Sequence, residues 1–473
     1  MPINTRTKIL ATLGPSSNTK EKIEELIEAG VDGFRLNFSH GTHEEHKNTY
    51  NLIRKVSAEK DVHIAVVADL QGPKLRIGKF KDGKVLLQKG QKFTFDMKKE
   101  LGDENRVTLP HKEIFEALKV GDTLLVNDGN IILKVLKCNK ESAVTEVEVG
   151  GFISGHKGVN LPNSSLNISP LTEKDLSDLD FSLELGVDCV CLSLVQRASD
   201  VTEARKIIGN KAWIISKLEK PQVLDELDDI IRASDMVMVA RGDLGVECPI
   251  VTVPLLQKRI EARCRQYGKP VIVATQMLES MISAPIPTRA EVSDVANAVY
   301  DGCDVVMLSA ETAAGNYPIE TVKTMRGVIE TVETDPKYLE YVNRFAENVS
   351  CNCESRAITH AANDVAKTMD KVTTIVSFSV SGATTLSMAQ ERPKLPVIAI
   401  TPSINIARRL NLIWGVRTYI NKKVFESFDN IEQVSSEVAR ASGLAHDNDF
   451  VVITAGYPFG KAGLTNVLHI VKV

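Results

Sequence analysis

The sequence predicts an α/β protein built on a (β/α)8 TIM barrel, with a small β-barrel lid domain inserted into it and an open α/β domain at its C-terminal end. Three observations predict this class. Eight apolar runs alternate with helix-period segments, short alternating runs interrupt them once, and a second α/β pattern follows. With 473 residues the chain is long for one domain, so we expect each part to have its own hydrophobic core.

The barrel is predicted from eight apolar runs of strand length, each of which ends in polar or glycine-bearing residues. They span residues 8–14, 33–39, 63–69, 188–194, 213–219, 236–242, 270–276 and 304–311. Most of the segments between them have the period of an amphipathic helix. We assign residues 1–71 and 171–347 to this barrel. Sites of such barrels lie where the strands end, so the polar residues after each run are the functional candidates.

Two of the helical segments carry start or stop signals. Residues 22–29 are expected to form a helix with Asn18 as its N-cap and Gly30 at its end. Thr288 and Glu291 form a capping box ahead of the helix between the seventh and eighth runs. These signals support the alternation of strands and helices.

The inserted domain is predicted where the alternation of strands and helices breaks, over residues 72–170. Short runs of strand character span residues 84–87, 92–95, 123–126, 131–135 and 144–149, and turn signals occur at Asp82-Gly83, Lys89-Gly90 and Asp128-Gly129. This pattern is typical of hairpins. The insertion follows the third barrel strand, on the catalytic face, where it could close over a substrate as a lid.

The C-terminal part, residues 348–473, has a third pattern. A helix is expected near residues 354–369, and strands are expected at residues 373–379, 396–401, 415–420, 450–455 and 467–471. Helical segments separate the first four strands, which predicts an open α/β domain.

The charge balance narrows the classes of partner. The chain has 57 basic and 61 acidic residues, a net charge of -4, which provides no global field for nucleic acid or an anionic membrane. Its apolar runs are only of strand length, and the N-terminal residues lack the apolar core of a signal peptide. We therefore expect a cytoplasmic protein that binds neither nucleic acid nor membrane.

The most informative polar residues follow the fifth and sixth runs. Lys217 and Glu219 are two residues apart, so on a strand they share one face, and Asp243 follows the next run. Two carboxylates from adjacent strands, with no histidine or cysteine near them, favour Mg²⁺ or Mn²⁺ over zinc. A lysine beside such a metal site suits phosphoryl transfer, because that reaction needs charge to be stabilised.

The second and third runs add further charged and polar residues. Arg35, Asn37 and Ser39 share one face, which places a guanidinium for a phosphate or carboxylate beside oxygen ligands for a hard cation. The third run ends at Asp69, and Lys74 follows in the next turn. We expect these residues to join Lys217 at the carboxyl ends of the strands.

Near the end of the seventh run is Thr275, whose hydroxyl could hydrogen-bond a substrate carboxylate or hold a water that delivers a proton. The sequence contains no Walker A or G-x-G-x-x-G stretch. The phosphates of a bound nucleotide would therefore be held by basic side chains and metal.

Seven motifs together resemble the pyruvate kinase family. They are RLNFSHG from Arg35, Gly72-Pro73 with Arg76, KGVNLP from Lys157, Lys217-x-Glu219, ARGDLG from Ala240, ATQMLESM from Ala274 and PTRAE from Pro287. Their order is also that of the family. The resemblance covers all three predicted domains and is densest from residue 5 to residue 315.

The resemblance implies transfer of phosphate from phosphoenolpyruvate to ADP, which gives pyruvate and ATP in the last step of glycolysis. It implies catalytic roles for Lys217, Thr275 and Arg35, substrate binding by Arg35, Lys217, Gly242, Asp243 and Thr275, nucleotide binding by Asn37, Phe38, Ser39, His40, Arg76 and Lys157, and magnesium binding by Glu219 and Asp243. In this scheme Lys217 stabilises the phosphoryl group in flight, and the lid brings in Lys157. A homotetramer is also implied.

The monovalent-cation site departs from the commonest family pattern. The common type binds K⁺ at residues like Asn37, Ser39 and Asp69, and has threonine and glutamate where this chain has Leu70 and Lys74. A unit charge ~4 Å from a carboxylate interacts at about 4 kcal/mol for an effective dielectric of about 20, so an ammonium can take the electrostatic role of K⁺. Members with this lysine are often K⁺-independent, and we expect appreciable activity without K⁺.

A loop of the C-terminal domain resembles the effector-phosphate loop of the family. It contains Ser379, Ser381, Gly382 and Thr384, whose hydroxyls and N–H groups could cradle a phosphate at a helix N-terminus. A second loop, residues 456–463, could cover the same ligand. The alternative is a capped helix and a turn that bind no effector.

Two other functions remain open from the sequence. A lyase that handles phosphoenolpyruvate or pyruvate on the same barrel would share the metal acids but would need neither the lid nor Lys157. A non-catalytic sugar-phosphate sensor would be free to lose Lys217 or Thr275, and both are present. The fold alone does not separate these functions.

Overall fold

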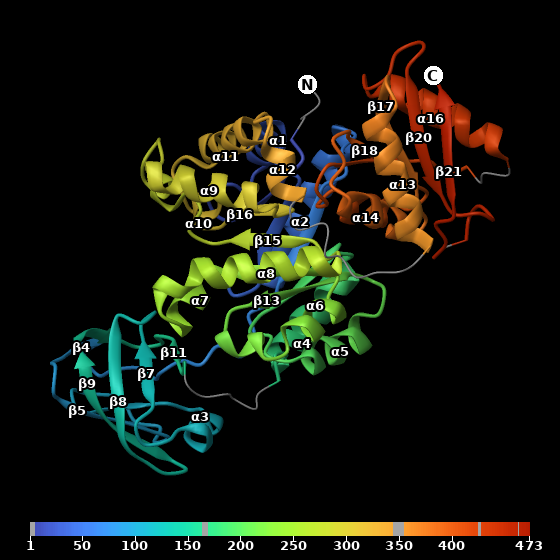
Figure 1. Cartoon of the computed structure of the whole chain (residues 1–473). Helices are drawn as coiled ribbons and strands as arrows, with labels where there is room; N and C mark the ends of the chain where they lie inside the picture. Colours follow the sequence, from blue (N-terminus) through green and yellow to red (C-terminus); the bar gives the residue numbers. More distant parts are fainter. Residues whose placement is uncertain (1–4, 163–168, 344–353, 424–426, 462) are drawn as a thin grey trace.

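The computed structural model describes residues 5–162, 169–343, 354–423, 427–461 and 463–473 (Figure 1). Eight parallel strands form a closed barrel in the spatial order β1-β16-β15-β14-β13-β12-β3-β2. They are β1 (Lys8–Thr12), β2 (Gly33–Asn37), β3 (Ala65–Asp69), β12 (Cys189–Leu192), β13 (Trp213–Leu218), β14 (Met236–Ala240), β15 (Val271–Ala274) and β16 (Val305–Leu308). Each lies within one of the eight predicted runs, which confirms the predicted (β/α)8 barrel.

Helices surround the barrel, so its strands are buried on both faces. All residues of β1, β3 and β14 are buried. The surrounding helices are α1 (Lys20–Ala29), α2 (His43–Glu59), α4 (Glu173–Leu185), α5 (Ala198–Ile208), α6 (Leu227–Ala233), α7 (Arg241–Glu247), α8 (Val253–Tyr267), α9 (Arg289–Asp301), α10 (Ala310–Ala313), α11 (Pro318–Glu333) and α12 (Tyr338–Asn343), with short 3-10 helices η1 (Pro221–Leu224), η2 (Ile250–Thr252) and η3 (Glu279–Ile282). This double burial explains why the strands read as continuous apolar runs.

The N-cap of α1 differs from the prediction by one residue, and the helix begins two residues before the predicted residue 22. Its N-cap is Thr19 and not Asn18, because the extended Thr19 uses its hydroxyl to accept the hydrogen bond of the N–H three residues later. Gly30 ends the helix in the left-handed conformation, as predicted. The capping box of Thr288 and Glu291 opens α9 with both reciprocal hydrogen bonds, which confirms that prediction.

The inserted segment is a separate, mostly-sheet domain with its own buried core, set to one side of the barrel in Figure 1. Its strands are β4 (Lys84–Leu87), β5 (Lys92–Asp96), β6 (Arg106–Thr108), β7 (Thr123–Val126), β8 (Ile131–Cys138), β9 (Ser142–Val149), β10 (Gly151–Ser154) and β11 (Val159–Asn160). Hydrogen bonds group them into a six-stranded sheet, β11-β7-β8-β9-β5-β6, and the pair β10-β4. A short helix, α3 (Lys112–Ala117), was not predicted.

The chain enters and leaves the lid through two paired segments, residues 75–77 and 157–159, which we call the lid ribbon. Arg76 and Gly158 face each other in an antiparallel bridge. The N–H of Val159 donates to the Leu75 carbonyl at 2.9 Å, and the N–H of Ile77 donates to the Lys157 carbonyl at 3.0 Å. The ribbon is therefore a two-stranded connection between the lid and the barrel.

The C-terminal part is the predicted open α/β domain. Its sheet has the order β19-β18-β17-β20-β21, in which only β21 is antiparallel to its neighbour. The elements are α13 (Glu354–Thr368), β17 (Val372–Phe378), α14 (Ala383–Gln390), β18 (Val397–Thr401), α15 (Ile404–Leu410), β19 (Val416–Ile420), α16 (Phe428–Ala441), β20 (Phe450–Ala455) and β21 (Val467–Lys472).

This domain packs against the amino-terminal end of the barrel strands. Lys8, the first residue of β1, donates from Nζ to the Val416 carbonyl at 2.9 Å. One buried apolar cluster contains barrel residues such as Ile215 together with Val397 and Leu412 of the C-terminal domain. The lid and the C-terminal domain thus lie at opposite ends of the barrel (Figure 1).

The domain boundaries after residues 71, 170 and 347 stay predictions, and the last of them lies outside the described residues. Among the helices that the structure describes, none has both the length and the apolar character needed to cross a membrane.

Candidate active site

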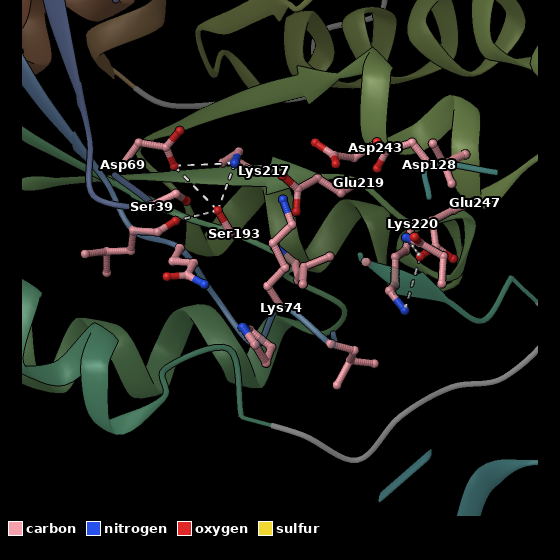
Figure 2. Close-up of a pocket in the computed structure, with 18 of the residues that line it drawn as sticks. Ser39, Asp69, Lys74, Asp128, Ser193, Lys217, Glu219, Lys220, Asp243 and Glu247 are labelled. Atoms are coloured by element: carbon pink, nitrogen blue, oxygen red, sulfur yellow. Dashed lines mark hydrogen bonds and ion pairs between the residues drawn. The ribbon is translucent and has the colours of Figure 1, made fainter. Parts of the chain in front are cut away.

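A cavity of about 210 Å³ lies at the carboxyl ends of the barrel strands, beside the lid (Figure 2). It is lined by the predicted site residues Arg35, Asn37, Ser39, His40, Asp69, Leu70, Lys74, Lys217, Glu219 and Asp243. The barrel brings these residues together from β2, β3 and β13, the turn after β3, and the start of α7. Their roles stay predictions.

Lys217 lies at the centre of the charged groups. Its Nζ is 2.8 Å from Glu219 Oε1 and 3.4 Å from Asp69 Oδ1, and it donates a 2.8 Å hydrogen bond to Ser193 Oγ. Burial lowers the pKa of Lys217, but the charges of Asp69 and Glu219 outweigh burial and raise that pKa above its ordinary value. Lys217 is therefore a cation throughout the neutral pH range.

Arg35 is held by a buried carboxylate. Its Nε donates to Asp69 Oδ2 at 2.6 Å, and its Nη1 donates to Thr12 Oγ1 at 3.1 Å. Burial by itself would raise the pKa of Asp69, but the charges of Lys217 and Arg35 leave that pKa below its ordinary value. Asp69 therefore fixes two cations at the floor of the cavity.

Glu219 and Asp243 have the character of a divalent-cation site. Glu219 is 3% exposed and its Oε2 accepts a 2.7 Å hydrogen bond from the N–H of Leu194. Its pKa is raised, first by burial and also by the charge of Asp243, although Lys217 opposes this. A divalent cation would relieve the repulsion between the two acids.

Mg²⁺ usually binds one or two carboxylates together with waters and substrate phosphates. Within the described ranges no group of three or more His, Cys, Asp or Glu residues is arranged to hold a metal. The pair of acids in the cavity thus fits Mg²⁺ or Mn²⁺, and does not fit a metal held by protein ligands alone.

Lys74 lines the cavity beside Leu70, and Figure 2 shows its side chain extending into that space. Asp69 pairs with Arg35 and Lys217, and Glu219 pairs with Lys217. Lys74 is therefore a third cationic residue of the cavity, beside the residues of the predicted monovalent-cation site and in addition to Arg35 and Lys217.

Thr275 and Gly242 lie together, but neither lines the cavity. The Thr275 hydroxyl accepts a 2.7 Å hydrogen bond from the N–H of Gly242 and donates at 2.6 Å to the Ala274 carbonyl. Thr275 has a φ of 69°, which is strained for a β-branched residue. Arg241, which donates to the Thr275 carbonyl at 2.7 Å and pairs with Asp294 at 2.7 Å, holds this turn in place.

Three predicted nucleotide contacts also lie outside the cavity. Phe38 is 2% exposed and stacks on His46 with 4.2 Å between ring centroids. Arg76 and Lys157 belong to the lid ribbon, where Arg76 Nη1 donates to the His156 carbonyl at 2.8 Å. The neighbouring Gly158, Val159 and Asn160 do line the cavity, so the lid ribbon borders it.

Sequence reasoning missed several residues of the site. Ser193 directly follows β12, and it accepts from Lys217 and donates to the Leu70 carbonyl at 2.7 Å. Lys220 and Glu247 also line the cavity. The position of Ser193 at a strand end was a usable signal, whereas the meeting of Lys220 with Glu247 depends on the tertiary structure.

A second cavity, of about 230 Å³, lies in the C-terminal domain. It is lined by the predicted Ser379, Ser381 and Thr384, by Lys422, Lys423 and Lys461, and by Gly456, Phe459, Gly460 and Gly463 of the second loop. Gly382 is the N-cap of α14 with a φ of 90°. Both predicted loops thus border one space, although residue 462 of the second loop lies outside the described residues.

The fold and this charged cavity define a TIM-barrel enzyme with an inserted lid, of a class suited to metal-assisted phosphoryl transfer. The family model described as "Pyruvate kinase, barrel domain" matches residues 4–322, and "Pyruvate kinase, alpha/beta domain" matches residues 356–471. The chain belongs to the pyruvate kinase family.

Known pyruvate kinases are similar to this chain over nearly its whole length. Pyruvate kinase of Agrobacterium vitis is 47% identical over 471 residues, 99% of this chain and 97% of that protein. Pyruvate kinase of Methylorubrum extorquens is 46% identical over 468 residues, 99% of this chain and 97% of that protein. A crystal structure of a pyruvate kinase from Cryptosporidium parvum matches with a TM-score of 0.94 at 32% identity, covering 99% of this chain and 96% of that chain.

Family membership makes the chain a phosphotransferase of glycolysis that uses phosphoenolpyruvate and ADP. This finding favours the enzyme over the two alternatives left open by the sequence, the barrel lyase and the non-catalytic sensor.

Proposed function

We propose that the chain transfers the phosphoryl group of phosphoenolpyruvate to ADP with Mg²⁺ or Mn²⁺ held by Glu219 and Asp243. The observation that carries this proposal is the mostly buried cation Lys217, whose Nζ is 2.8 Å from Glu219 and whose side chain is 12% exposed. A positive charge fixed in a water-poor cavity stabilises the charge that develops on the phosphoryl oxygens. When bound, the divalent ion would supply further positive charge to the same oxygens.

In this mechanism Arg35 holds the phosphate of phosphoenolpyruvate and Lys217 contacts the group as it moves. The pairing of Arg35 with Asp69 supports this assignment, because it fixes the planar guanidinium before the substrate arrives. Ser193 and Asp69 orient the Lys217 ammonium in the same way. Positioning of this kind suits a reaction in which the protein forms no covalent bond.

After transfer, the enolate left behind must take a proton on its methylene carbon. We assign the proton path to Thr275, through a water, and the substrate carboxylate to the pocket of Gly242, Asp243 and Thr275. The hydrogen bond from the Gly242 N–H and the strained backbone of Thr275 support this assignment. Asn37, Phe38, Ser39, His40, Arg76 and Lys157 are assigned to the nucleotide side.

The decisive experiment follows pyruvate formation from phosphoenolpyruvate and ADP in the parental protein and in Lys217→Met. We expect Lys217→Met to lower kcat by about a hundredfold or more, because it removes the cation that stabilises the phosphoryl group. Binding of Mn²⁺, measured by calorimetry, should be largely retained. Lys211→Met, which changes an exposed lysine before β13, is the matched control. A near-parental kcat in Lys217→Met would contradict the assignment.

We propose further that Lys74 takes the electrostatic role of K⁺. Lys74 and Leu70 line the cavity together with Asn37, Ser39 and Asp69, the residues of the predicted monovalent-cation site. We expect the rate at saturating substrates to change less than about tenfold when K⁺ is removed, since a fixed ammonium supplies the charge. Lys74→Met should lower the rate in K⁺-free buffer. A rate at least about a hundredfold lower for the parental enzyme without K⁺ would contradict the proposal.

The proposal also includes an effector site and an oligomeric state. The second cavity is assigned to a phosphorylated effector, because it combines the N-terminal end of α14 with three lysines. The chain is assigned to a cytoplasmic homotetramer. The assay above, repeated with a panel of sugar phosphates and nucleotides, tests the effector: a change in the KM for phosphoenolpyruvate identifies it.

A further inference from the structure

Two hydrogen bonds join the base of the lid to the barrel. Asn160, in β11, donates from Nδ2 to Glu247 Oε1 at 2.7 Å. Gln222, in η1, donates from Nε2 to the Pro162 carbonyl at 3.0 Å. Both contacts hold residues 160–162, where the chain leaves the lid.

The acceptor of the first contact is a buried charge with a buried partner. Glu247 is 2% exposed and Lys220 is 5% exposed, and Lys220 Nζ is 3.7 Å from Glu247 Oε1. The other oxygen of Glu247 is buried and has no hydrogen-bond partner in the described part of the chain. A buried carboxylate needs a neighbouring opposite charge, and Lys220 supplies it.

The two residues of this ion pair lie close in sequence to the proposed metal ligands. Lys220 directly follows Glu219, and Glu247 lies one helical turn after Asp243 on α7. Figure 2 shows Lys220 and Glu247 together at the side of the cavity where Asp243 and Asp128 lie. The lid is therefore attached at the edge of the site itself.

The attachment continues directly into the lid ribbon. Lys157 is three residues before Asn160, so its Cα lies within roughly 10 Å of the Asn160 Cα. Arg76 is paired with Gly158 on the opposite side of the ribbon. Fixing Asn160 thus restricts the positions of both basic residues of the ribbon.

We propose that Asn160, Glu247 and Lys220 form a lid anchor, a set of positioning residues that holds Arg76 and Lys157 within reach of the nucleotide. This inference rests on the proposed function, which assigns those two residues to ADP. An anchored ribbon loses less conformational freedom when ADP binds, so the anchor strengthens ADP binding. None of its three residues is assigned to the phosphoryl group, so its loss should change the KM for ADP more than kcat.

The test begins with Asn160→Asp, which replaces the amide donor by a carboxylate facing Glu247. We expect the KM for ADP to rise about tenfold or more, with kcat at saturating ADP changed by less than about threefold. In the substrate-free protein, hydrogen–deuterium exchange of residues 157–162 should become faster. Asn105→Asp, which adds the same charge to an exposed site of the lid, is the matched control and should leave both readouts at parental values.

The double variant Asn160→Asp/Glu247→Gln separates an anchor from a role in lid folding. The new glutamine amide can donate to the new aspartate, which also gives Lys220 a carboxylate partner. We expect this variant to return the KM for ADP and the exchange rate to within about threefold of the parental values. Parental behaviour of Asn160→Asp, or no recovery in the double variant, overturns the proposal. If the parental protein lacked kinase activity, the proposed function would fail, and the exchange rates would still decide whether the anchor exists.

Discussion

At the scale of single residues, Glu261 on α8 is a buried acid that the proposed reaction does not use. Its side chain is 1% exposed, and Gln257 donates to its Oε1 at 3.3 Å, whereas its Oε2 has no hydrogen-bond partner among the described residues. Burial, with a further contribution from Asp301, raises the pKa of Glu261 to about 8. Folding therefore keeps a proton on this carboxyl at pH values where the unfolded chain has lost it.

This proton makes the stability of the fold depend on pH. Between about pH 5 and pH 8 the folded chain binds a proton at Glu261 that the unfolded chain does not, so the free energy of unfolding should fall as pH rises. The slope for one proton is about 1.4 kcal/mol per pH unit. Urea denaturation from pH 5 to pH 8 measures it, and Glu261→Gln should flatten the slope. An equal slope in both proteins would show that Glu261 is not its source.

The site residues that could be predicted are those whose position follows from strand alternation. Lys217 and Glu219 were expected to share a face because they are two residues apart at the end of β13, and both line the cavity. Glu247 could not be found in this way, because its partners Asn160 and Lys220 come from two other elements, one of them in the lid. Strand alternation predicts which residues lie together at a strand end. It does not predict which residues of a helix or of the lid will contact them.

At the scale of elements, Glu291 ties α9 to the segment after β15. It accepts hydrogen bonds from the Thr288 N–H at 2.8 Å, within the capping box, and from the Ser280 N–H at 2.7 Å. Bonds from Ser280 and Thr288 hold the pKa of Glu291 below its ordinary value although burial opposes them. The capping box therefore also fixes η3 through Ser280, which is five residues beyond Thr275.

Replacing Glu291 by alanine should cost more stability than breaking an ordinary capping box. We expect Glu291→Ala to lower the free energy of unfolding by about 1–3 kcal/mol, because the Ser280 donors lose a partly buried acceptor. Glu45→Ala is the comparison. Among the described residues, the carboxylate of Glu45 in the capping box of α2 accepts from Thr42 alone, and a loss of about 1 kcal/mol or less is expected there. Equal losses in urea denaturation would count against the second role of Glu291.

Helices and strands could be predicted where a single segment had a clear pattern of apolar residues. The barrel strands are apolar over their whole length because helices cover them, and all eight were found. The helix α3 has only six residues, too few to show a helical period, and β11 has two residues that are strand only because β7 pairs with them. Such short elements are set by distant contacts that a local pattern does not contain.

At the scale of the whole molecule, an exposed apolar surface on η2 and α8 supports the proposed assembly. Ile250, Val251 and Leu255 are 67%, 83% and 69% exposed. Apolar side chains so close together and so exposed are typical of an interface. The tetramer is a prediction by resemblance, and this surface gives it a place to be tested.

The test is to put a charge on that surface. Val251→Asp should shift the protein toward smaller species in light scattering at fixed concentration, because an interface would have to bury an unpaired carboxylate. Val120→Asp, on the exposed surface of the lid at 66% exposure, is the control and should leave the mass unchanged. An unchanged mass in Val251→Asp would place the interface elsewhere.

The order of the three parts along the chain was predictable, but their arrangement in space was not. The insertion point after β3 places the lid at the carboxyl ends of the strands. The position of the C-terminal domain at the other end depends on contacts such as that of Lys8 with Val416, which are more than 400 residues apart in sequence. The predicted effector cavity therefore belongs to a domain packed against the end of the barrel remote from the reaction.

The lid ribbon has a consequence for how this architecture can change. Arg76 and Gly158 face each other, and opposed residues of an antiparallel pair have Cα atoms only about 5 Å apart. The barrel chain is therefore almost continuous across the insertion, and a short turn could close it if residues 77–157 were absent. With its own core, the lid is a separable module. Its sequence and size can vary while the barrel stays the same, as long as Asn160 keeps its contact with Glu247 and the ribbon keeps Arg76 and Lys157.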